Sequence, residues 1–221
     1  MVQSAAMRAG MKAGVRPLWL HPAAKPLVFV LCALPCAWLV YAALADTLGA
    51  NPAEALIRAT GDWTLRALCL VLAVTPLRVL TGTPALARFR RMLGLWVFFY
   101  AALHFVCYAV LDQGLDMPAI VRDVGKRPFI LVGSLALVLL ALLAATSTQR
   151  AVRALGARRW QALHRAVYAV AGLALLHFFW MRAGKRNFAE VAVYAAILGV
   201  LLGWRLGHVW WRRRRPAGVT N

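Results

Sequence analysis

The chain is poor in acidic residues. It has 7 Asp and Glu against 26 Lys and Arg, and its formal net charge is +19. Charged residues of both signs make up only 15% of it, whereas 62% is hydrophobic, above the roughly 45–50% of soluble domains. A basic excess can indicate nucleic-acid binding, but here the basic residues stand in short runs between apolar segments. No soluble basic domain is left, so the composition predicts an integral membrane protein.

Several common motifs are also missing. The four cysteines (Cys32, Cys36, Cys69 and Cys107) all lie inside apolar segments, and neither CxxC nor CxxCH occurs. No disulfide framework, zinc site or covalently attached haem is therefore predicted. A glycine-rich phosphate loop is absent as well, and the apolar runs leave no room for an appended nucleotide domain.

Long apolar runs are abundant instead. A helix needs about 20 apolar residues to cross a bilayer, and runs of about that length lie at 26–48, 63–80, 92–111, 128–147, 160–181 and 189–211. We expect an all-α, six-helix transmembrane bundle over 26–211, flanked by basic segments 1–25 and 212–221. The first run is longer than a signal-peptide core of about 7–15 residues, so we expect it to remain as the first helix. Pro128 suits the first turn of the fourth.

Charge predicts the orientation. All 7 acidic residues lie in three alternate connectors or in the ends of the runs beside them, while the two terminal segments and the other two connectors are basic and contain none. Because basic loops stay on the cytoplasmic side, both termini are predicted to be cytoplasmic.

Four histidines lie within the runs, and His208 is near the inner end of the sixth. His104 is in the third, and His164 and His177 are in the fifth. Ionisable residues inside a membrane are a functional signal. His104 and His177 are predicted at one depth in the outer half, where facing imidazoles could hold the iron of a b-type haem. The alternative is that they are hydrogen-bonded polar residues between helices. On one continuous helix, His164 and His177 would lie about 20 Å apart and point about 140° apart.

His164 has no histidine partner at its inner depth, where the third run supplies Arg91 and Met92. It is predicted to be a ligand of a second haem, a proton-handling residue at a quinone site, or a hydrated interfacial residue. A bend at Gly172 could reorient it, and His208 is an unconventional partner for it. These alternatives stay open on the sequence alone.

Four arginines stand near the ends of the runs: Arg66, Arg78, Arg165 and Arg205. They either extend to the headgroups or pair with haem propionates or a flavin phosphate. Arg66 lies at the depth of His104 and His177. Arg78 and Arg165 lie at the inner depth.

Three stretches together resemble one family. They are LGLWVFFYAALHFVCYAVLD, DVGKRPFILVG and GARRWQALHRAVYAVAGLALLHFFWMRAGK. They resemble the MsrQ (formerly YedZ) family, the haem-binding membrane subunits of bacterial methionine sulfoxide reductase systems, within the ferric-reductase-like transmembrane group. The resemblance covers about residues 60–205, and His104, His164 and His177 match the three family histidines.

This resemblance implies a function. It implies one or two haem b groups, FMN, and a place in the bacterial inner membrane. Electrons would pass from the respiratory quinone pool to MsrP, a periplasmic molybdopterin subunit that reduces methionine sulfoxide in proteins and forms a heterodimer with MsrQ. Catalysis would then lie on the partner, docked on the third and fifth connectors. The alternatives are a ferric or quinone-linked reductase without MsrP, and a non-redox scaffold with structural histidines.

Overall fold

The computed structural model describes residues 20–183 and 188–214; most of the two predicted basic terminal segments lies outside this range. Within these described residues there are six membrane-length helical spans, which confirms the predicted all-α, six-helix fold. The long helices are α2 (Ala24–Leu44), α3 (Pro52–Leu80), α4 (Arg90–Cys107), α6 (Pro128–Ala145), α8 (Val167–Ala183) and α9 (Ala189–Arg214). The shorter elements are a 3₁₀ turn η2 (Pro84–Phe89), a π turn η3 (Tyr108–Asp112), α5 (Met117–Lys126) and α7 (Gln149–His164).

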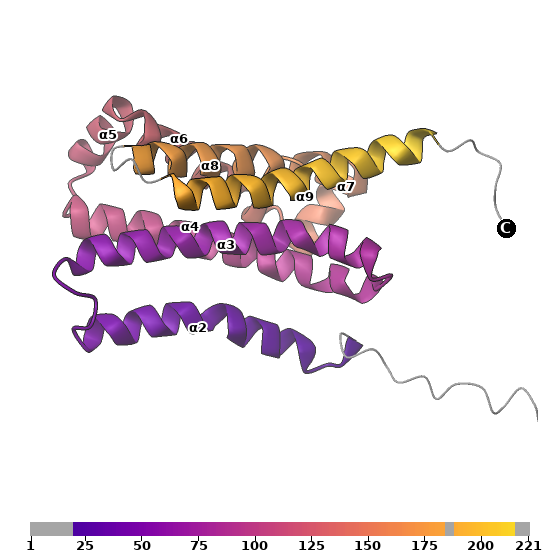
Figure 1. Ribbon diagram of the computed structural model, residues 1–221, viewed down its shortest axis with the longest axis horizontal. Coiled ribbons are helices and arrows are strands. Elements are labelled where there is room, and N and C mark those ends of the chain that lie inside the picture. The colour runs from indigo at the N-terminus through magenta and orange to yellow at the C-terminus, as the bar shows by residue number, and fades with distance from the viewer. Residues whose placement is uncertain (1–19, 184–187, 215–221) are drawn as a thin grey trace, which may run out of the picture.

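The long helices run side by side (Figure 1). The start of α2, the end of α9 and α7 share one end of the bundle, the α7 end, and α5 marks the other, the α5 end. Helix α3 packs mainly on α4, and α6 packs mainly on α8. Their contact forms the core, which includes Leu65, Leu68, Val97, Leu140 and Val170. Since α3 contributes more of this core than any other helix, it is the central element of the bundle.

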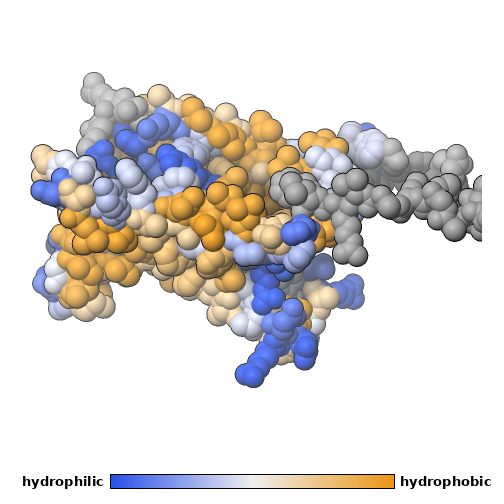
Figure 2. Space-filling view, turned by 90° about the horizontal axis from the view of Figure 1, so that it is seen from below, coloured by the Kyte–Doolittle hydropathy of each residue, from blue (hydrophilic) through white to orange (hydrophobic). Residues whose placement is uncertain are grey.

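The surface is apolar around its middle. Large hydrophobic side chains are exposed along the outward faces, for example Trp38, Val138 and Val200. Figure 2 shows broad apolar surface between hydrophilic side chains that gather toward the ends. In water such a surface would be unfavourable, whereas lipid tails match it. The chain is therefore a multi-pass membrane protein.

Helix α3 is longer than predicted. It begins at Pro52 instead of about residue 63, with the Asn51 side chain accepting a hydrogen bond from the Glu54 amide at 3.1 Å. Proline in the first helical turn and a capping Asn side chain are both favourable. The polar first turns of this helix resemble a connector, which is why the apolar pattern missed them. As a result Asp62 lies within a helix.

Helix α2 is attached to the bundle by Tyr100 of α4, next to Pro35 inside α2. Pro35 has no N–H and weakens the helical hydrogen bonding around it. The Tyr100 hydroxyl of α4 donates to the Cys32 carbonyl at 2.6 Å and accepts from the Cys36 amide at 3.2 Å. It thus bridges two successive turns of α2, a helix with few buried residues.

Tyr100→Phe tests this attachment. The substitution keeps the ring and its aromatic neighbours but leaves polar groups of α2 without a partner, which costs about 1–3 kcal/mol. We expect a lower midpoint of thermal denaturation in detergent than for wild type. Tyr41→Phe, which alters an exposed side chain of α2, is the control and should leave the midpoint unchanged. Equal midpoints for both variants would rule out the attachment.

Helix α9 is attached to the bundle at a second proline, Pro76 of α3. Pro76 cannot donate to the carbonyl of Leu72, four residues earlier in α3. The Arg205 guanidinium of α9 donates to that carbonyl at 2.6 Å and to the Tyr168 hydroxyl of α8 at 2.7 Å. Arg205 therefore joins three helices instead of extending to the headgroups.

The fifth predicted span is two helices. The chain leaves helical geometry at Arg165–Ala166, so α7 ends at His164 and α8 begins at Val167. Bonds from the Arg165 amide to the Ala162 carbonyl and from the Ala166 amide to the Leu163 carbonyl form a tight turn there. The prediction of one continuous helix was wrong, so the spacing and the angle between His164 and His177 can no longer be derived from ideal helix geometry. The break lies at this turn and not at Gly172.

Candidate functional site

The structure brings His104 of α4 and His177 of α8 together inside the bundle. Their ring centres are 6.1 Å apart, and the ring planes are nearly perpendicular, at 78°. The two side chains come from the two helix pairs of the fold, α3–α4 and α6–α8. The histidine pair is therefore held by both halves of the core.

Each ring is oriented by a backbone carbonyl. His104 Nδ1 lies 2.8 Å from the Ile57 oxygen of α3, and His177 Nδ1 lies 2.7 Å from the Phe129 oxygen of α6. A carbonyl oxygen can only accept, so each Nδ1 must carry the proton. The lone pair of each ring is then on Nε2, and neither Nε2 has a hydrogen-bond partner within 20–183 and 188–214. Metal-binding histidines are oriented in this way, with the second nitrogen donating to a carbonyl.

Two glycines make room for the rings. A Cβ on Gly133 would lie 2.8 Å from His177 Nδ1, and one on Gly61 would lie 3.2 Å from His104 Nδ1. Each glycine comes four residues after the carbonyl that its histidine binds, at Phe129 and Ile57. The missing side chains let both imidazoles rest on the backbones of the facing helices.

A cavity of about 500 Å³ surrounds the pair and opens toward the α5 end; we call it the histidine cavity. Apolar and aromatic side chains form most of its walls, including Leu65, Phe105, Phe129 and Phe178. Arg58, Arg127 and Arg182 also line it. Each of these arginines is paired with a carboxylate, respectively Glu54, Asp123 (2.8 Å) and Glu190.

The pair fits the axial ligands of a haem iron. A metal–imidazole bond is about 2 Å long and the ring centre lies about 1 Å behind the nitrogen, so one ion between two rings places their centres about 6 Å apart. No group of three or more His, Cys, Asp or Glu in the described part of the chain could hold a metal ion. A metal on this pair would need further ligands, which a porphyrin supplies.

A second cavity, of about 600 Å³, lies toward the α7 end. Its floor contains Leu68, Val71, Val97, Leu140 and Leu143, and its rim contains Arg90, Arg91, Arg158 and Arg165, so we call it the arginine cavity. His164 lines it, with its ring stacked on Trp160 at 4.0 Å between centres and its Nε2 3.2 Å from the Thr146 hydroxyl. Leu68 and Leu140 line both cavities and so lie between them.

The predicted site residues thus separate into three groups. His104 and His177 share the histidine cavity, and His164 and Arg165 share the arginine cavity. Arg66, Arg78 and His208 line neither. Arg66 lies over the Trp63 ring and donates to the Tyr194 hydroxyl, Arg78 is exposed near the end of α3, and His208 stacks on Trp204.

Sequence reasoning missed several lining residues. Gly133 carried a usable signal, because a glycine inside an apolar run at the depth of a histidine indicates close approach. Gly61 carried none, because it precedes the second apolar run. Arg90 and Arg158 stood in basic connectors, where membrane orientation already explained them. Arg58 stood in turns that were read as a connector.

The fold and the site define a class: a multi-pass helical membrane protein with two histidines held close together in a cavity inside the bundle. The model of the ferric reductase like transmembrane component matches residues 60–175. The chain belongs to the MsrQ family, as its resemblance predicted.

Three relatives show the extent of the match, and each is named protein-methionine-sulfoxide reductase heme-binding subunit MsrQ. The protein of Polaromonas naphthalenivorans is 65% identical over 207 residues, which is 94% of either chain. That of Bordetella pertussis is 54% identical over 87% of this chain and 93% of its own. That of Herminiimonas arsenicoxydans is 48% identical over 89% and 90%. No solved structure gives a significant match.

Proposed function

We propose that this protein is a haem-binding electron-transfer subunit of a methionine sulfoxide reductase system, with His104 and His177 as the axial ligands of a b-type haem. The observation that carries the proposal is the facing pair, with each Nδ1 bonded to a carbonyl and each Nε2 free. The names of its relatives support the same function. The haem supplies one-electron chemistry when bound, and the chain supplies the ligands and an apolar cavity that set its potential.

The propionates of this haem would meet the arginines of the histidine cavity. Arg58, Arg127 and Arg182 line it, and guanidinium groups bind carboxylates in bidentate fashion. Each arginine would then bind a propionate in addition to its present carboxylate partner. Arg66 stays a prediction from the sequence, since its contacts with Trp63 and Tyr194 lie outside the cavity lining.

We also propose a direction for the electrons. The charge pattern supports an orientation with the α7 end in the cytoplasm and the α5 end in the periplasm of a bacterial inner membrane. Quinol would then deliver electrons near His164, with Arg78 and Arg165 at the same end, and a periplasmic MsrP-like molybdopterin subunit would take them at the α5 end. FMN, and a second haem on His164, are proposed from the family resemblance.

The test is stopped-flow spectroscopy of the purified, haem-loaded protein. A quinol should reduce the haem, and adding the oxidised MsrP-like subunit should reoxidise it within the turnover time of the reconstituted system. A protein that quinol reduces but this partner does not reoxidise would instead be a ferric or quinone-linked reductase. A protein without a Soret band would be a membrane scaffold with structural histidines.

A further inference from the structure

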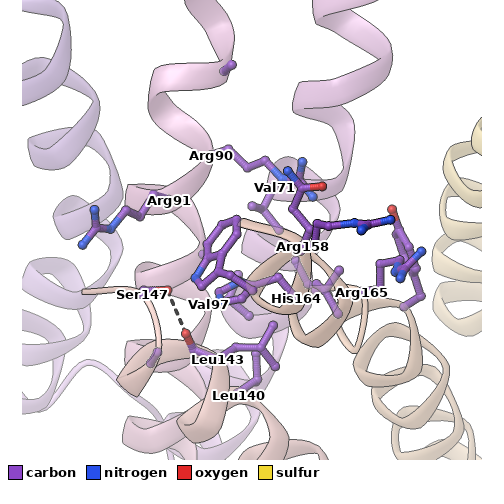
Figure 3. Close-up of a pocket in the computed structure, with 18 residues that line it drawn as sticks. Val71, Arg90, Arg91, Val97, Leu140, Leu143, Ser147, Arg158, His164 and Arg165 are labelled. Carbon is purple, nitrogen blue, oxygen red and sulfur yellow. Dashed lines mark hydrogen bonds between the residues drawn. The ribbon is translucent and has the colours of Figure 1, made fainter. Parts of the chain in front are cut away.

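The arginines at the two ends of the bundle are held differently. At the α7 end, none of the residues that line the arginine cavity is acidic, and Figure 3 shows Arg90, Arg158 and Arg165 extending there on the same side as His164. At the α5 end, each arginine that lines the histidine cavity is paired with a carboxylate. A paired carboxylate fixes the direction of a guanidinium group. The way in which each arginine is paired therefore shows which of its nitrogens remain for another anion.

Arg127 differs from the other two arginines of the histidine cavity in the nitrogen that it uses. Arg58 and Arg182 each bind their carboxylate through a terminal nitrogen, Nη2. Arg127 pairs with Asp123 through Nε, at 2.8 Å from Oδ1, and its two terminal nitrogens have no hydrogen bond or ion pair within residues 20–183 and 188–214. A guanidinium group binds a carboxylate best through two parallel N–H donors. Arg127 thus keeps both terminal donors for a second carboxylate.

Tyr108 fixes the carboxylate that fixes Arg127. The Tyr108 hydroxyl donates to Asp123 Oδ2 at 2.7 Å, whereas Arg127 pairs with Oδ1, so both oxygens of this carboxylate are occupied. Only 13% of the Asp123 side chain is exposed. The main chain is held as well, because the Arg127 amide donates to the Asp123 carbonyl at 2.9 Å. The three residues form one chain of contacts that ends at the Arg127 guanidinium.

The path of the backbone brings these three residues together. Tyr108 opens the π turn η3, and such turns are frequent at functional sites. The backbone then passes through Gly114 and Leu115, whose φ angles are 58° and 61°. A leucine rarely adopts this left-handed conformation, so the surrounding structure must hold it there. This turn leads into α5, whose Asp123 meets Tyr108 again fifteen residues along the chain.

Both ends of this chain of contacts lie beside the histidine pair. Tyr108 follows His104 by four residues, and its amide donates to the His104 carbonyl. Arg127 precedes by two residues Phe129, whose carbonyl binds His177. Tyr108 and Arg127 both line the histidine cavity. The free donors of Arg127 are therefore part of the wall around the two histidines.

We propose that Tyr108 and Asp123 are positioning residues, which hold Arg127 so that its terminal nitrogens bind a propionate of the haem. The inference rests on the proposed haem of the histidine cavity, and it adds two residues that act on this haem through Arg127. Guanidinium and carboxylate groups match in geometry and charge. Without the Tyr108 hydroxyl, the Asp123 carboxylate would be free to turn, and the guanidinium group would lose its direction.

The test measures how fast haem leaves the loaded protein, in nanodiscs of phosphatidylcholine, for an excess of apomyoglobin. We expect Arg127→Gln to release haem at least about tenfold faster than wild type, because it loses hydrogen bonds to a charged group. Tyr108→Phe loses one orienting bond and should release haem about two- to tenfold faster. The double variant Tyr108→Phe/Arg127→Gln should release haem no faster than Arg127→Gln, because Tyr108 acts through Arg127.

Tyr194→Phe is the matched control. The Tyr194 hydroxyl accepts a hydrogen bond from Arg66 at 3.3 Å, and neither residue of this tyrosine–arginine pair lines the histidine cavity. This variant should release haem at the wild-type rate. The comparison separates the effect of the tyrosine hydroxyl at the cavity from that of any tyrosine hydroxyl bound to an arginine.

A second ligand separates positioning from general stability. Haem dimethyl ester carries methyl esters in place of both propionates, so it cannot form the ion pair, and Tyr108→Phe should release it at the wild-type rate. The proposal is overturned if Tyr108→Phe releases haem at the wild-type rate, or if it releases the ester faster by the same factor as haem. A wild-type protein without a Soret band would contradict the haem site itself, and this inference with it. Equal release rates from haem-loaded proteins would contradict this inference alone.

Discussion

Replacing either His104 or His177 with alanine is expected to remove the haem of the histidine cavity. Each ring supplies one Nε2, and the ring centres are 6.1 Å apart. Since loss of even an outer partner of a metal ligand lowers affinity about 10–100-fold, loss of the ligand should lower haem affinity by at least that factor. The Soret absorbance per protein, measured after purification in detergent, reports this loss.

His208→Ala is the control for these variants, because His208 stacks on Trp204 away from both cavities. It should keep the wild-type spectrum. Full haem content in both His104→Ala and His177→Ala would show that the pair does not bind iron.

His164→Ala gives a separate result from the pyridine haemochrome assay. A ratio near two haems per chain that falls in this variant assigns a second haem to His164, whereas an unchanged ratio near one leaves it the interfacial or quinone role.

Gly133→Ala is expected to disrupt the site without touching a ligand. The new Cβ would lie 2.8 Å from His177 Nδ1. This is the same nitrogen that donates to the Phe129 carbonyl. The ring must move, and the bond that fixes its protonation is lost. Alanine is itself the better helix former by about 1 kcal/mol, so the helix should not be weakened. We expect haem occupancy to fall by about tenfold, the lower range for loss of an orienting partner.

Two other glycines make this a graded series. Gly61→Ala places a Cβ 3.2 Å from the His104 ring, where a small shift relieves the contact, so a smaller loss is expected. Gly172→Ala meets nothing within 4 Å and should leave the haem content unchanged. Haem content that is equal in all three variants would show that the close approach of ring and helix is unimportant. Absorbance spectra of equally loaded samples give the ranking directly.

The sequence predicted the parts of this protein that depend on periodicity and depth. Six apolar runs gave six spans, because a bilayer requires apolar helices of fixed length. His104 and His177 were placed together because their two runs cross in the same direction. Neither inference needed any knowledge of how the helices pack.

Other parts depend on packing and carried no local signal. The break at Arg165–Ala166 contains neither glycine nor proline; it follows from the bonds that hold Trp160 and His164 to Thr146. Arg58 entered the histidine cavity only because α3 extends back to Pro52 through polar residues. The convergence of Arg90 with Arg158 joins connectors far apart in the chain, which a single sequence cannot reveal.

Leu68 and Leu140 form an apolar layer between the two cavities, and this layer decides which charges can pass between them. Leu68 is fully buried, Leu140 nearly so, and each lines both cavities. An electron can tunnel through such a packed layer, whereas a proton needs a chain of hydrogen-bonding groups that these side chains do not offer. On the proposed path an electron would therefore cross without a compensating proton, and the step would be electrogenic. The membrane voltage would then act on it with up to about 2.3 kcal/mol per 100 mV, so the layer would make the repair of oxidised methionine responsive to the energetic state of the cell.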